Sequence, residues 1–112
     1  MSRDLDWLHD LFEPVGPISV RRMFGGAGIY RDGKMFALVA DGEVFLKSDN
    51  LLEPRFRAAG CRPFVYDKDG KGVAMSYWSL PEAALDDAEA VKDWAEAAFQ
   101  AALRAAKPRL AR

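Results

Sequence analysis

The chain has 112 residues, of which 50% are hydrophobic and 29% are charged, and its formal net charge at pH 7 is −1. This length fits one globular domain with its own hydrophobic core, and the composition excludes a disordered chain. The near-neutral charge excludes a global electrostatic field that attracts nucleic acid or acidic membranes, so DNA binding would require a local basic face.

The elements expected in the first half of the chain are one helix and four strands. Residues 3–12 carry leucines at helical spacing, and the segment "EPVGP" that follows ends the helix because proline lacks the N–H group that a helix needs. Asp32-Gly33 and Asp41-Gly42 are strong signals for tight hairpin turns. They predict an antiparallel meander with strands at 19–24, 28–31, 34–40 and 43–48.

The second half predicts a short helix, two strands and a long helix. The short helix begins near residues 48–50 and ends at Gly60, a residue suited to the left-handed position after a helix. Strands are expected at 62–67 and 73–80; the latter has apolar residues on both faces, so its pattern leaves the buried face open. From an N-cap at Asp86 or Asp87, apolar residues then recur at three- and four-residue spacing through Ala106.

This order of elements predicts the fold class. It reads helix, four strands, helix, two strands, helix, without the strand–helix alternation of a parallel sheet. We therefore expect a two-layer α+β domain in which helices pack on an antiparallel sheet of five to six strands.

The cellular location is also constrained by the sequence. Cys61 is the only cysteine, which excludes an intramolecular disulfide and suits a reducing compartment. The first residues, "MSRDLDWLHDLF", lack the features of a signal peptide, and no apolar run approaches the roughly 20 residues that cross a membrane. We expect a cytoplasmic protein without a membrane segment.

The glycine cluster "RRMFGGAGIY" (residues 21–30) is the densest motif in the chain. Its spacing matches neither a dinucleotide-binding fingerprint nor a P-loop, and a strand rather than a helix is expected after it. The interpretation that we favour is structural: Gly25, Gly26 and Gly28 permit a bulge, a turn or the close approach of another strand.

Catalytic chemistry finds little support among the side chains. His9 is the only histidine, so no histidine pairs with Cys61 in sequence, and no ligand set for a metal or other cofactor stands out. We expect no enzyme activity. A small-ligand or enzymatic site near Cys61 or Tyr77 stays open as an alternative.

Basic residues in the predicted meander offer a binding surface. Arg21, Arg22, Arg31 and Lys47 could share one face with aromatic residues such as Tyr77, a mixture that holds phosphates and stacks bases. Positive charges on strands also protect sheet edges from unwanted pairing. We favour a solvated or partner-contact role over direct DNA binding.

Three segments of the chain carry a recognisable combination of motifs: "RRMFGGAGIYRDGKMFALVADGEVFLK", "AAGCRPFVY" and "MSYWSLPEAALDD". In combination they resemble one known family, the TfoX/Sxy N-terminal domain, over about residues 10–106. The resemblance implies a compact domain similar to secretion-chaperone-like folds, and a family associated with the regulation of natural competence. Family motif positions, interpreted here as structural, include Met23, Phe24, Gly25, Gly26, Gly28, Gly33, Gly60, Pro63, Phe64 and Pro81.

The resemblance also shapes the functional expectation. The family offers no catalytic residues to transfer to this chain. Residues 1–112 are expected to be a single N-terminal-type domain, because the chain ends where the C-terminal helical domain of competence regulators begins. We expect a stand-alone, non-enzymatic regulatory module, monomeric or homodimeric, that contacts a protein partner such as the transcription machinery. Direct nucleic-acid binding through the basic strip is the alternative.

Overall fold

The computed structural model of the chain describes residues 5–23, 26–68 and 71–106; residues 3–4, Phe24 and Gly25 of the predicted elements lie outside these ranges. Within them, three α-helices and six strands follow the predicted order, with two short 3-10 helices that the sequence did not predict. The elements are α1 (Asp6–Leu11), η2 (Glu13–Val15), β1 (Ser19–Met23), β2 (Gly26–Arg31), β3 (Lys34–Ala40), β4 (Glu43–Lys47), α2 (Glu53–Ala58), β5 (Pro63–Lys68), β6 (Lys71–Ser79), η3 (Glu82–Ala84) and α3 (Ala88–Ala106).

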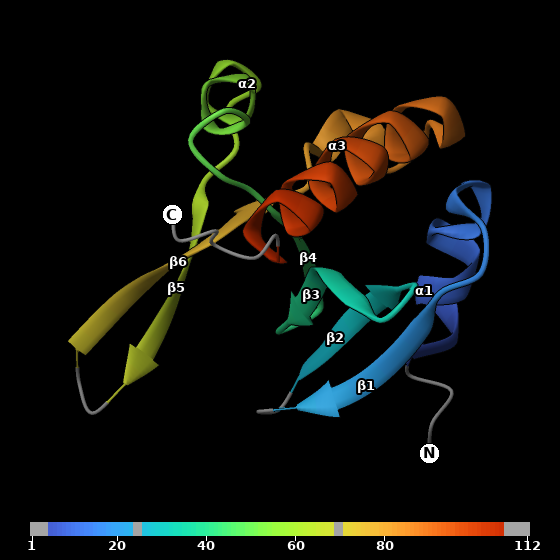
Figure 1. The fold of residues 1–112 in the computed structure, drawn as a ribbon, viewed down its shortest axis with the longest axis horizontal. Coiled ribbons are helices and arrows are strands. Elements are labelled where there is room, and N and C mark those ends of the chain that lie inside the picture. The colour runs from blue at the N-terminus through green and yellow to red at the C-terminus, as the bar shows by residue number, and fades with distance from the viewer. Residues whose placement is uncertain (1–4, 24–25, 69–70, 107–112) are drawn as a thin grey trace, which may run out of the picture.

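The six strands form one antiparallel sheet in the order β1-β2-β3-β4-β6-β5. Its two predicted tight turns are confirmed, because Asp32 (φ 51°) and Gly33 (φ 78°) both have positive φ, as do Asp41 (φ 51°) and Gly42 (φ 77°). Positive φ at both central residues gives a two-residue turn the twist that matches the flanking strands. Beyond β4 the chain leaves the sheet to form α2 and returns as the β5–β6 hairpin, which extends away from α3 (Figure 1).

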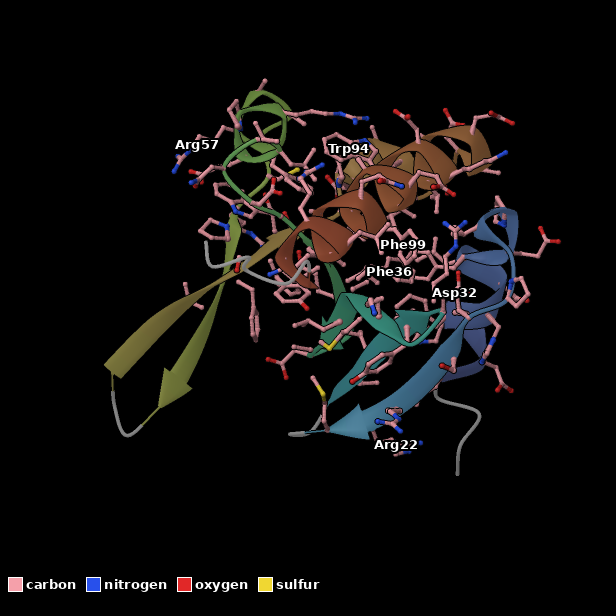
Figure 2. The ribbon with its side chains drawn as sticks, in the orientation of Figure 1. Arg22, Asp32, Phe36, Arg57, Trp94 and Phe99 are labelled. Atoms are coloured by element: carbon pink, nitrogen blue, oxygen red, sulfur yellow. The ribbon has the colours of Figure 1, made fainter. Side chains whose placement is uncertain are left out.

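The helices pack with one face of the sheet to form the main core. Figure 1 shows α3 crossing the sheet near β3 and β4, with α1 beside β1 and α2 near the other end of the sheet. The ring centroid of Phe36 on β3 lies 5.4 Å from that of Phe12, which follows α1, and the two rings meet edge to face. It also lies 6.3 Å from the ring centroid of Phe99 on α3, again edge to face (Figure 2). In this edge-to-face geometry the positive edge of one ring meets the negative face of the other, which stabilises the packing of the helices on the sheet.

A second aromatic group fixes α2 to the rest of the domain. Phe56, fully buried on α2, lies 4.8 Å from the Trp94 ring on α3 and 6.1 Å from the Trp78 ring on β6. The short helix therefore depends on tertiary packing, as expected for a helix of only 6 residues.

The long helix begins as its sequence indicates. The Asp87 carboxylate accepts hydrogen bonds from the backbone N–H groups of Glu89 (3.1 Å) and Ala90 (3.2 Å), so Asp87 rather than Asp86 is the N-cap. Along α3, Val91, Ala95 and Ala98 are buried in the core, as the predicted apolar stripe requires.

The predicted α+β fold with helices on an antiparallel sheet is therefore confirmed. The strand that the pattern left open, β6, places Trp78 in the main core and Tyr77 in a smaller cluster on the opposite face, so both faces bury apolar groups. No helix in the described part of the chain combines the length and the apolar character needed to span a bilayer.

Candidate interaction surface

We call the sheet face that points away from α3 the second face. This face carries its own apolar cluster. The alternation of side chains along β3 and β4 produces it: Leu38 and Phe45 are register partners, and they lie between residues that point into the main core. Cross-strand contact with Tyr77 leaves all three side chains with less than a tenth of their surface exposed. The cluster consists of Leu38, Phe45 and Tyr77, with Met35, Ala40 and Phe64 packed around them.

Tyr77 has a perturbed ionisation equilibrium on this face. Burial, and to a smaller extent the neighbouring Tyr30 phenol, raise the pKa of Tyr77 to about 12. The hydroxyl group therefore stays protonated at physiological pH and remains a hydrogen-bond donor.

Two cations of the second face lie over its tyrosines. The guanidinium of Arg21 is 5.4 Å from the Tyr30 ring centroid, and the Lys47 ammonium is 5.3 Å from the Tyr77 ring. Lys47 also donates a hydrogen bond of 3.2 Å to Ser76 Oγ. Cation–π contacts of this kind hold long basic side chains close to a surface and fix where their charge is presented.

The other predicted contact residues do not join them. Arg22 follows Arg21 in β1 and pairs in register with Ala27, a core residue, so alternation turns it to the opposite face of the sheet. Figure 2 shows Arg22 on β1, away from the Phe36–Phe99 contact. Arg31 donates a 2.6 Å hydrogen bond to Glu96 of α3 and lies 4.5 Å from the Phe99 ring. Of the five predicted contact residues, Arg21, Lys47 and Tyr77 thus share the second face, and of these only Lys47 and Tyr77 are in contact.

Most arginines of the described ranges are matched by acids. Besides Arg31, ion pairs join Arg55 to Asp93 and Arg62 to Glu43. Arg57 pairs with Glu53 and Arg104 with Asp49 in the same way. None of these pairs, within the part of the chain that the structure describes, involves Arg21 or Lys47.

Gly26 and Gly28 of the glycine cluster lie inside the sheet, on β2. A Cβ atom added to Gly26 would be 2.0 Å from the carbonyl oxygen of Val39 on β3, so the backbones approach too closely there for any side chain. Gly28 is surrounded by the side chains of Met35 and Tyr30, beside a register shift between β2 and β3. The described residues from Gly26 onward form strand β2 rather than a helix, so they provide no helix N-terminus to favour phosphate.

The remaining family-motif positions lie at element ends or on the second face. Met23 ends β1, Gly33 completes the β2–β3 turn and Gly60 follows α2 with φ +78°. Pro63 begins the edge strand β5, where a missing N–H group is tolerated, and Phe64 packs 4.9 Å from Phe45. Pro81 precedes η3, whereas Phe24 and Gly25 lie outside the described residues.

A separate groove borders Cys61. It has a volume of about 490 Å³ and is lined by Cys61, Arg62, Ser79 and the exposed apolar side chains of Trp7 and Leu85, but not by Tyr77. Burial raises the pKa of the Cys61 thiol, against smaller lowering effects from a hydrogen bond with Ser79 and the charge of Arg62. A thiol in this state is a weak nucleophile at neutral pH. The described residues contain no group of three or more side chains suited to hold a metal ion.

Sequence reasoning missed two features of these surfaces. The ion pair between Arg31 and Glu96 links residues 65 apart in sequence, and nothing in the local pattern indicates it. The second face did have a signal: "MFALVA" (residues 35–40) is apolar at consecutive positions, which is typical of a strand buried on both faces.

Comparison with known proteins identifies the family. The model of the TfoX N-terminal domain family matches residues 10–102. The chain is 31% identical over 82 residues to the DNA transformation protein TfoX1 of Aliivibrio fischeri, covering 73% of this chain and 39% of that protein. It is 27% identical over 70 residues to the DNA transformation protein TfoX of Haemophilus influenzae, covering 61% of this chain and 32% of that protein. The chain thus aligns with well under half the length of these relatives. The resemblance seen in the sequence is confirmed, and the chain belongs to the TfoX N-terminal domain family.

Proposed function

We propose that this chain is a non-enzymatic regulatory module that acts in the transcriptional control of competence through contact with a protein partner. Residues 1–112 serve as one TfoX N-terminal domain in this proposal, and the module works in the cytoplasm as a monomer or homodimer. The names of the two relatives, both DNA transformation proteins, support the link to competence.

The second face is the observation that supports protein contact. It combines aromatic and aliphatic side chains with two cations held over tyrosines, a composition typical of protein interfaces. Nucleic acid is a poorer match, because duplex binding neutralises several phosphates and most described arginines are already bound to acids.

The thiol next to the groove supports a non-enzymatic role. The raised pKa of Cys61 keeps the thiol protonated at neutral pH, and His9, the only imidazole, does not line the groove. A nucleophilic mechanism needs a base within hydrogen-bond reach of the thiol.

Three measurements test the proposal. Deletion of the gene should lower the transcription of competence genes, and the tagged chain should recover a specific protein partner that is absent from an untagged control. Purified chain should give no specific shift of duplex DNA at physiological salt. Specific DNA binding at that salt, together with the recovery of no partner, would refute protein contact as the mode of action.

A further inference from the structure

On the basis of the proposed function, we propose that the second face binds an extended acidic segment of its partner, with carboxylates at Arg21 and Lys47 and apolar side chains over the cluster between them. The proposal deepens the protein-contact role by naming the chemistry of the ligand. It depends on three properties of the face: unmatched charge, the spacing of that charge, and the apolar surface between the charges.

The first property is charge without an internal partner. Five arginines of the described ranges bind acids of the same chain, whereas no ion pair found there uses Arg21 or Lys47. Arg21 is exposed and Lys47 is half-buried, and both are held in place by aromatic rings. A carboxylate arriving from outside would therefore meet two charges that form no ion pair with an acid in the described part of the chain.

The second property is spacing. Arg21 belongs to a row of register partners that continues through Gly28 and Leu38 to Phe45, and Lys47 lies two residues beyond Phe45 on β4. Three strand spacings and two residue steps separate the two cations by about 15 Å. An extended chain covers that distance in roughly 5 residues, so two acidic positions at that separation would reach both cations.

The third property is the surface between the charges. Leu38, Phe45 and Tyr77 are already mostly covered and form its base, so the apolar area open to a ligand belongs to the half-buried side chains of Tyr30, Met35 and Phe64. The Tyr77 hydroxyl, protonated at neutral pH, adds a donor beside Lys47 that can bind a carboxylate or a backbone carbonyl. This combination fits apolar side chains flanked by acids better than it fits a uniformly charged ligand.

Two other occupants match the second face less well. A duplex would place a phosphate about every 1.7 Å of its axis, whereas the described part of this face presents two cations that form no ion pair there. A second copy would offer its acidic segment at 82–89, in which Leu85 is the exposed large apolar side chain, so it presents less apolar surface between acids than the extended segment proposed here.

The test uses the full chain and a labelled peptide of defined sequence, Asp-Glu-Phe-Leu-Ala-Phe-Asp-Glu, with capped ends. A matched peptide carries Asn and Gln in place of the acids. Fluorescence anisotropy measures binding of both peptides to the natural chain, to the Arg21→Glu, Lys47→Glu double variant and to Arg22→Glu. The last variant is the control, because it reverses an exposed charge on the same strand but on the opposite face. Circular dichroism checks that each variant is folded.

The acidic peptide should bind the natural chain, and the double variant should bind it about tenfold more weakly, since two exposed ion pairs are lost and charge reversal replaces their attraction by repulsion. Arg22→Glu should change the affinity by less than about twofold, because screening limits its effect on the other face. In the natural chain, backbone NMR shifts on adding the peptide should centre on Tyr30, Leu38, Phe45 and Tyr77.

Any of four results would overturn the inference. They are no binding of the acidic peptide, equal binding of the uncharged peptide, an equal loss in Arg22→Glu, or NMR shifts confined to the groove at Cys61. Tighter binding of a DNA duplex that the double variant abolishes would assign the face to nucleic acid instead. A doubled mass in light scattering that the same variant abolishes would assign it to a second copy.

The two proposals fail separately. If competence transcription depends on the chain but the acidic peptide does not bind, the inference is wrong and the proposed function stands. If the peptide binds the second face but deletion leaves competence transcription unchanged, the face is a docking site and the proposed function is wrong.

Discussion

Replacing Gly26 with alanine should destabilise the domain far more than the same change two residues later. The added Cβ would lie 2.0 Å from the carbonyl oxygen of Val39 and 3.1 Å from its carbonyl carbon. These are backbone atoms of the neighbouring strand, so no side-chain rotation relieves the clash, and β2 must separate from β3 by about 1 Å to reach ordinary contact.

The magnitude follows from the kind of atom that must move. Overpacking that displaces backbone costs about 1–3 kcal/mol, occasionally more. Here the displacement disturbs the pairing of β2 with β3 beside the main core, so we take the upper end of that range. We expect Gly26→Ala to lower the free energy of unfolding by about 3 kcal/mol. For a domain of this size, that is a fall in Tm of roughly 12 °C.

Gly28→Ala is the matched control. Its added Cβ would meet the sulfur of Met35 at 3.1 Å and a ring carbon of Tyr30 at 3.2 Å, and the flexible thioether can move aside. Both substitutions restrict the unfolded chain equally, so that effect cancels in the comparison. The loss for Gly28→Ala should stay below about 1 kcal/mol.

Urea unfolding followed by circular dichroism and tryptophan fluorescence measures both losses, provided that the two signals coincide. Equal losses in the two variants, or a loss of less than about 0.5 kcal/mol for Gly26→Ala, would refute the close approach of β2 and β3 at this point.

Three further predictions concern α2, acid stability and the second face. Phe56→Ala should lower the free energy of unfolding by about 3–5 kcal/mol, because the substitution removes a fully buried ring that lies between Trp78 and Trp94. Tryptophan emission should shift to the red, and an unchanged emission spectrum would contradict this packing. The hydrogen bond with Arg104 holds the pKa of Asp49 below its ordinary value, so this carboxylate stabilises the fold above about pH 4 and the effect is lost as pH falls through the lowered pKa. Asp49→Asn should therefore be less stable than the natural chain at neutral pH, by on the order of 1 kcal/mol or less. The variant should also lose less stability than the natural chain when the pH is lowered from neutral to acid. Identical dependence of unfolding free energy on pH in the two proteins would refute the role of the Asp49–Arg104 pair. Ultraviolet titration should show one tyrosine ionising near pH 12, and Tyr77→Phe should abolish that step.

The hairpin turns and element order were predictable because they depend on local chemistry. Asp32-Gly33 and Asp41-Gly42 determine where the strands reverse, and alternation then requires Arg21 and Arg22 to point to opposite faces. The sequence pattern left open whether the four basic residues share one face, and the period of two along β1 places Arg22 on the face opposite Arg21.

Other features depend on packing between distant segments. The partner of Arg31 is set by the position of α3 over the sheet, and the burial of Tyr77 is set by the pairing of β4 with β6. The apolar run at 35–40 indicated burial on both faces of β3, but it could not show that strands rather than a helix surround Leu38 on the second face.

The placement of β6 between β4 and β5 has a consequence for how the domain folds. Strands β1 to β4 follow one another through short connections, and β5 and β6 form a hairpin of their own, so both units depend on contacts that are local in sequence. The two units join where β4 pairs with β6, and there Phe45 lies opposite Ser79, which is 34 positions later in the sequence (79 − 45). This β4–β6 pairing, the seam of the sheet, requires closure of the long connection that contains α2. Because non-local pairing is the slow step in sheet formation, we expect the β4–β6 seam to form late. The pairing of Lys47 with Tyr77, and with it part of the second face, would then be completed only when the two halves of the sheet meet.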